Sequence, residues 1–291
     1  MDEETLKKLE KRLADGEISE ETYKKIKARY EEEESVEEEE FEDEDDEEIE
    51  MDEEPVDTEG KTKNVSLSGA SKAADVNCHS FSSSGASKIE GYLKADEARI
   101  SGATKVEGDA FLGELFSSGS LKVKGETEAD SMELSGAGRF KGIVRAKKIK
   151  SNGSSKFESN VEADEFKSSG ALKIEKNITG KKFKASGSFK IEGTLEAQEI
   201  MLKPGGNCSI THIEGGDVLV ESGGSGLFSM FKKGALKSKS ITGERIYLEN
   251  TTAEKVEGEE VKIGPGCKID KVKAKDLKVH ESSSVGSKSV R

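Results

Sequence analysis

The chain has 291 residues and a formal net charge of −14; 36% of its residues are charged, 32% are hydrophobic and none is Trp. So few apolar residues argue against a wide globular core and favour a slender repeat structure joined to a polar segment. No segment approaches the roughly 18 apolar residues of a membrane span, and the charged N-terminus has no apolar stretch of a signal peptide, so we expect a soluble, cytoplasmic protein.

The charge is divided unevenly along the chain. Residues 1–30 hold eight acids and eight bases, residues 31–60 hold 21 acids and no base, and residues 61–291 hold 31 acids and 38 bases. A mildly basic body therefore carries a strongly acidic segment.

Residues 1–30 are predicted to form a helical hairpin. Asp15-Gly16 separates two amphipathic stretches, and Ser19 is suited to cap the second. The spacing resembles the SHOCT module, a short helical unit appended to many bacterial and archaeal proteins, and this resemblance implies oligomerisation or partner binding. The alternative is a plain helical leader. The predicted partner-binding residues are Leu6, Leu9, Leu13, Ile18, Tyr23, Ile26 and Tyr30.

Residues 31–63 are predicted to be a disordered acidic linker, because self-repulsion and a lack of apolar residues keep such a chain extended. One interpretation is a solvated spacer. The other is an electrostatic strap that lies along the basic body or guards its end. A cation-binding role is disfavoured, since the acids lack the glycine-punctuated spacing of a calcium loop.

Residues 84–202 divide into seven consecutive blocks of 17 residues, and we number the positions of a block as columns 1–17. Column 5 is always basic and column 6 always large and apolar, beginning with Lys88 and Ile89. A fixed period of this length indicates a solenoid. Column 2 is Gly in every block: Gly85, Gly102, Gly119, Gly136, Gly153, Gly170 and Gly187.

Each block contains three short apolar centres, near columns 6, 10–12 and 15–17, separated by turn residues. This arrangement predicts three short strands per coil and hence an all-β, three-sided parallel β-helix. We expect the column-2 glycines to supply positive φ angles at the corners. Coils spaced about 4.8 Å apart would stack residues 64–288 into roughly 13 coils and a rod of about 60 Å.

The repeat is less regular outside the central blocks. Residues 64–83 open with a coil one residue short, residues 203–244 are predicted to be an irregular Gly-rich segment, and residues 245–288 return to coils of 16 residues. Within the Gly-rich segment lies the most apolar exposed stretch, which suits a peripheral contact with the inner face of the cell membrane. The alternative is a loop that packs on the rod. The predicted membrane contacts are Leu227, Phe228, Met230, Phe231, Lys232 and Lys233.

Catalytic, metal-binding and cofactor-binding residues are not predicted. Cys78, Cys208 and Cys267 are far apart, and Cys78 and His79 should point to opposite faces of a strand. No phosphate-binding or nucleophile motif is present. A hexapeptide acyltransferase, also a three-sided solenoid, is disfavoured because the unit here is 17 residues with unlike thirds. Acids interleaved with the column-5 bases argue against nucleic-acid binding.

The repeated motif Ser-Gly-Ala-x-Lys-Ile-x-Gly-x-Leu-x-Ala resembles the bactofilins, polymer-forming cytoskeletal proteins. The resemblance covers residues 64–202 and, more loosely, 245–285. It implies a right-handed three-sided β-helix that joins end to end into filaments without nucleotide and serves as a membrane-associated scaffold. Bactofilins can carry a Phe-plus-Lys membrane-targeting segment, usually at the N-terminus, whereas the similar stretch here is internal.

The two end coils are the predicted polymer interface, because an uncapped end exposes unpaired backbone groups and apolar side chains that another end can cover. The residues concerned are Val65, Leu67, Val272, Leu277, Val279 and Val285. Joining of opposite ends would give a polar filament and joining of like ends a non-polar one. The competing hypothesis is a monomeric spacer that docks a partner through its N-terminal helices.

Overall fold

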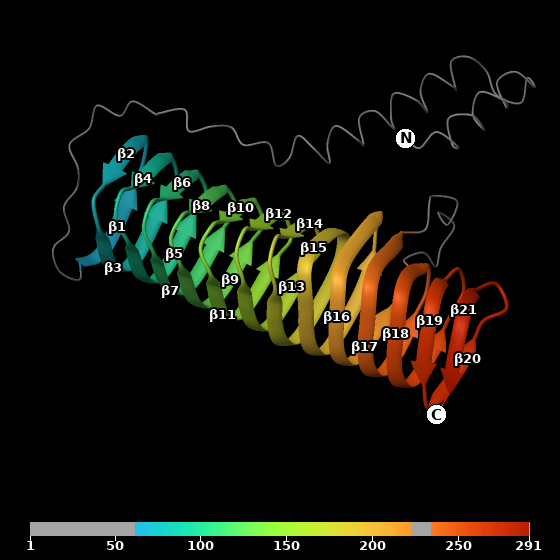
Figure 1. The fold of residues 1–291 in the computed structure, drawn as a ribbon. Coiled ribbons are helices and arrows are strands. Elements are labelled where there is room, and N and C mark those ends of the chain that lie inside the picture. The colour runs from blue at the N-terminus through green and yellow to red at the C-terminus, as the bar shows by residue number, and fades with distance from the viewer. Residues whose placement is uncertain (1–61, 223–233, 291) are drawn as a thin grey trace, which may run out of the picture. The chain divides into compact units, whose positions relative to one another are not determined.

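The structure, a computed structural model, describes residues 62–222 and 234–290 (Figure 1). These residues form an all-β solenoid of about 13 turns, in which parallel strands about 17 residues apart pair from coil to coil. The predicted helical hairpin, the acidic linker up to residue 61 and the 227–233 stretch lie outside the described residues.

Short and long strands alternate along the first half of the solenoid. The short ones have four residues and the long ones eight, apart from the six-residue first strand. Their bounds are β1 Thr62–Leu67, β2 Ala70–Ala73, β3 Val76–Ser83, β4 Ala86–Ile89, β5 Leu93–Ile100, β6 Ala103–Val106, β7 Ala110–Ser117, β8 Ser120–Val123, β9 Thr127–Leu134, β10 Ala137–Phe140, β11 Val144–Ser151, β12 Ser154–Phe157, β13 Val161–Ser168 and β14 Ala171–Ile174.

In the second half the strands run continuously through the corners. Their bounds are β15 Ile178–Pro204, β16 Asn207–Val220, β17 Ala235–Leu248, β18 Thr251–Ile263, β19 Lys268–Ala274, β20 Asp276–Val279 and β21 Ser284–Val290. Every pairing is parallel, as expected when each coil repeats the path of the one before it.

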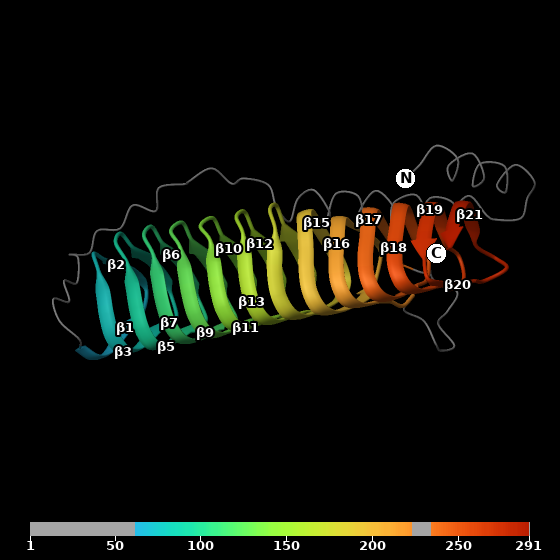
Figure 2. The ribbon, with the colours of Figure 1, turned by 60° about the horizontal axis from the view of Figure 1, so that its bottom comes forward.

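Each regular coil consists of one short strand on columns 3–6 and one long strand on columns 10–17 (Figure 2). The long strand bends in its middle. In β13, Val161 and Ala163 point inward, the next two residues point outward, and Phe166 and Ser168 point inward again. The ladder also skips column 13 at this bend. A coil thus has three stretches of alternating burial, as the column pattern predicts.

The register is 17 residues across the central coils, where Val144 pairs with Val161 and Val161 with Ile178. The ladder then continues through residues 203–244, which form β16 and part of β17, so the predicted loss of regular structure there is wrong. The offset between β16 and β17 is 28 because the chain between them includes 223–233. The glycines of this region therefore accompany a long corner rather than a break in the solenoid.

The core is a narrow column of stacked apolar side chains. Identical columns stack because residues 17 apart occupy the same environment in successive coils, and Ile89, Val106 and Phe140 are completely buried in column 6. Two pairs of Phe rings stack face to face, Phe140 on Phe157 at 5.2 Å and Phe166 on Phe183 at 5.3 Å between ring centroids. Such contacts add to the hydrophobic stabilisation of a thin core.

The column-2 glycines are required for a reason other than the predicted one. Of the seven, only Gly187 has a positive φ, at 94°. A Cβ on Gly102 or Gly153 would instead collide with the carbonyl oxygen of the column-2 glycine one coil earlier. The corner therefore excludes side chains because the backbones of adjacent coils approach closely, and the prediction of positive φ is wrong for six of the seven.

Candidate assembly surfaces

The C-terminal end of the solenoid is an open layer. Leu277 and Val279 pair with Val261 and Ile263 on one side, and within the described residues no strand pairs with β20 on its other side. Val285 is likewise only partly buried, and Val290 is 61% exposed. This end therefore combines unpaired backbone groups with apolar side chains, as an assembly surface requires.

Val272 is not part of that outermost layer. It is 2% exposed, and its backbone pairs with Val256 on one side and with Lys288 of β21 on the other. Lys288 thus occupies, at the outer layer, the inward column held by Ile241, Val256 and Val272 in the preceding coils. An inward-placed charge at a sheet edge opposes further strand pairing, and the repeat pattern did not reveal it.

The N-terminal end differs from the C-terminal one. Val65 and Leu67 of β1 pair with Phe81 and Ser83, and they are only 9% and 5% exposed. These two predicted interface residues therefore belong to the buried core, whereas Leu277, Val279 and Val285 remain accessible.

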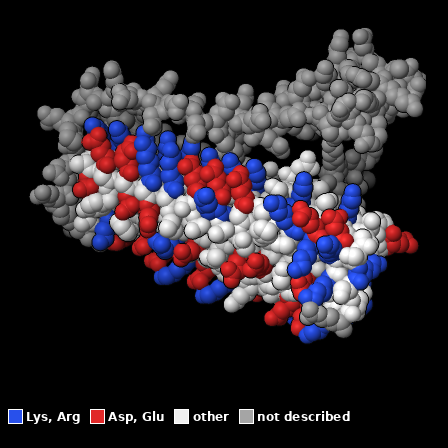
Figure 3. Space-filling view, in the orientation of Figure 1, with Lys and Arg blue, Asp and Glu red and all other residues white. Residues whose placement is uncertain are grey.

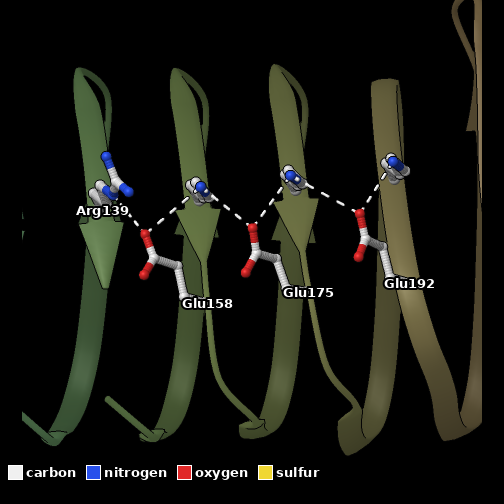
Figure 4. A network of polar contacts seen from close by, with 7 residues as sticks. Arg139, Glu158, Glu175 and Glu192 are labelled. Carbon is white, nitrogen blue, oxygen red and sulfur yellow. Dashed lines mark hydrogen bonds and ion pairs between the residues drawn. The ribbon is translucent and has the colours of Figure 1, made fainter. Parts of the chain in front are cut away.

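A ladder of alternating charges runs along the short strands (Figure 4). Glu158 accepts a hydrogen bond from Arg139 at 2.5 Å and lies 3.6 Å from Lys156. Lys156 also lies 3.2 Å from Glu175, which contacts Lys173 at the same distance. Each acid therefore bridges the basic residues of two successive coils, which offsets the repulsion within column 5, as the sequence predicts.

The ladder changes the protonation of its acids. Partial burial of Glu175 favours the neutral form, but hydrogen bonds from Lys173 and Lys156 outweigh this and hold its pKa below the ordinary 4.5. Glu107 follows the same logic, with Lys124 and Lys105 as donors that lower its pKa. These acids stay ionised under mildly acidic conditions.

A shallow groove follows the bend of the long strands, which the column pattern did not predict. Its floor is the small residues of column 12, including Ala129, Ala146 and Ala163. Charged residues of columns 11 and 13 form its rims and pair across coils, as Lys147 does with Asp130 at 2.6 Å. Because its cations are matched by acids, the groove has no marked preference for a charged ligand.

The geometry of the histidines and cysteines offers no assembled catalytic group. His79 is exposed and contacts Asp96 at 2.6 Å, whereas Cys78 beside it is buried, as strand alternation predicts. His212 and His280 contact the hydroxyls of Ser240 and Ser282. Across 62–222 and 234–290, His, Cys, Asp and Glu side chains form no cluster suited to a metal ion.

Two predicted sites lie outside the described residues. They are the helical positions Leu6, Leu9, Leu13, Ile18, Tyr23, Ile26 and Tyr30, and the membrane-contact positions Leu227, Phe228, Met230, Phe231, Lys232 and Lys233. In the part of the chain that the structure does describe, no helix has the length and apolarity needed to cross a bilayer.

Comparison with known proteins gives one partial relative. The chain is 44% identical over 79 residues to the uncharacterized protein YhbF of Bacillus subtilis (strain 168), a match that covers 26% of this chain and 32% of the relative. The chain thus matches about a third of that relative's length. No family model matches the chain, and no solved structure matches it.

Proposed function

We propose that this chain is a bactofilin-like structural protein that assembles end to end into nucleotide-independent filaments or scaffolds, built on a right-handed, three-sided β-helix. The observation that carries the proposal is the open C-terminal layer, where Leu277, Val279 and Val285 lie partly exposed beside unpaired backbone groups. Covering such a layer continues both the ladder and the core. The protein would act in the cytoplasm, with residues 227–233 as a peripheral membrane contact and the N-terminal helices as a partner-binding unit.

Electron microscopy of the purified full chain without nucleotide tests the proposal. We expect the wild type to form filaments or sheets. Leu277→Arg should abolish them while leaving the circular dichroism of a β protein, because an arginine in the open layer adds charge and bulk to the joint. Lys278→Gln on the same strand, at an exposed position, is the matched control and should assemble normally.

Monodisperse wild-type protein over a wide range of salt concentrations would refute assembly itself. Normal filaments of the Leu277→Arg variant would leave assembly intact and would refute only the assignment of the joint to the C-terminal layer.

A second function, a monomeric spacer that docks a partner through residues 1–30, is favoured by one observation. Lys288 occupies an inward column in the outermost layer, where a stacked coil would have to desolvate its ammonium group. This hypothesis predicts a single chain per particle by light scattering at all concentrations, and filaments would contradict it. An acyltransferase, the remaining alternative, draws no support from the described histidines.

A further inference from the structure

We propose that the acidic segment 31–60 binds, within the same chain, to a cationic step on the solenoid formed by Lys122, Lys124, Arg139 and Lys141. The proposal goes beyond self-assembly and does not depend on it. It assigns a defined surface to a segment whose sequence alone leaves two interpretations, a solvated spacer and an electrostatic strap.

The cationic step is a local failure of the charge ladder. In five of the seven central blocks column 7 is Glu, and it pairs with column 5 of its own coil, as Glu107 does with Lys105 at 3.1 Å. In the two blocks that contain β8 and β10, column 7 is Lys124 and Lys141 instead. Figure 3 shows the result as a block of basic side chains between two acidic groups on the face of the short strands.

The neighbouring acids are already shared between coils and cannot neutralise the step. Glu107 contacts Lys124 at 2.8 Å as well as Lys105, and Glu158 contacts both Arg139 and Lys156. From β2 to β15, columns 5 and 7 hold ten bases and five acids. Like charges on coils about 4.8 Å apart repel by roughly 1 kcal/mol even in water, so an added anion is stabilising here.

The acidic segment is the polyanion that best fits this surface. It holds 21 acids and no base, and it joins the solenoid at β1, which pairs with β3 at the N-terminal end. The strand β8 lies three coils beyond β2, about 15 Å along the stack, whereas 30 extended residues reach up to about 100 Å.

The covalent connection favours this segment over a separate partner. A tethered polyanion meets the cationic step at an effective concentration on the order of millimolar. A nucleic acid or an anionic membrane must compete with it from bulk solution and against its 21 acids.

Carbodiimide cross-linking of the full chain, followed by peptide mass spectrometry, tests the proposal. We expect cross-links from residues 31–60 to concentrate on Lys122, Lys124 and Lys141 and to fall as salt rises. In an isotopically mixed sample they should join residues of the same chain. The double variant Lys124→Glu/Lys141→Glu, which restores the alternation of the other coils, should reduce them about tenfold by reversing two contacts.

The control is Lys237→Glu/Lys271→Glu, which makes the same charge change at exposed positions away from the step and should leave the cross-links unchanged. Cross-links spread evenly over the surface lysines, or undiminished in the first double variant, would overturn the proposal. So would cross-links only between chains. Binding of an oligonucleotide or of phosphatidylserine vesicles to the full chain through Lys124 and Lys141 at physiological salt would show an open step and would also overturn it.

Discussion

At the scale of single residues, the column-2 glycines show how a repeated residue can be required by contact between coils. A Cβ on Gly153 would meet the carbonyl oxygen of Gly136 in the preceding coil, although the φ of Gly153 is not positive. Backbone atoms cannot rotate out of the way as a side chain can, so the coil spacing itself would have to change.

We predict that Gly153→Ala lowers the free energy of unfolding by about 1–3 kcal/mol, the usual cost of overpacking a rigid site. Gly206→Ala is the matched control, because a Cβ there meets no atom within 4 Å, and its effect should stay within about 0.5 kcal/mol. Urea unfolding followed by circular dichroism measures both. Equal midpoints for the two variants would contradict the steric explanation.

At the scale of elements, the short strands are held together by acids shared between coils as well as by backbone hydrogen bonds. Glu175 joins the coil of β12 to that of β14 through Lys156 and Lys173. Its pKa is lower in the folded state than the ordinary 4.5, so its contribution is present above about pH 4.5 and is lost as the pH falls through the folded pKa below that value.

We therefore predict that the free energy of unfolding decreases between about pH 5 and pH 3 as the ladder acids become protonated. Glu175→Gln should reduce the size of this decrease, since it removes one of the groups that titrate. Glu196→Gln, at an exposed position, should leave the decrease as in the wild type. Denaturant titrations at a series of pH values provide the measurement, and identical pH profiles for the two variants would exclude a role for the ladder.

At the scale of the whole solenoid, stability is distributed over contacts between neighbouring coils. Each coil pairs only with the one before and the one after it, as β11 does with β9 and β13. Such a chain behaves as a one-dimensional stack, so a complete coil is a removable unit.

Deletion of residues 152–168, one complete block, should leave a folded protein with cooperative unfolding and a rod shorter by about 4.8 Å. Deletion of residues 152–159 alone should prevent folding, because it moves outward columns into the core. Circular dichroism and small-angle scattering distinguish the outcomes. An unfolded first variant would show that coils are not equivalent units.

The repeat predicted most of the fold because residues 17 apart share one environment. Ile89, Val106 and Phe140 recur at one column in the sequence and are buried in one stack in the structure. The role of Gly153 was mispredicted since a sequence pattern records that Cβ is excluded without recording whether a dihedral angle or a neighbour excludes it. The position of Lys288 could not be predicted, because coil length falls to 16 near the C-terminus and obscures the column assignment.

The long corner between Val220 and Ala235 has a practical consequence. The strands β16 and β17 keep full register on both sides of it despite the 28-residue offset. Chain length at this corner is therefore independent of coil stacking, which makes it a natural position for grafting a foreign sequence. An epitope or a small fluorescent domain exchanged for residues 223–233 would be displayed once per chain while the ladder beneath it stays continuous.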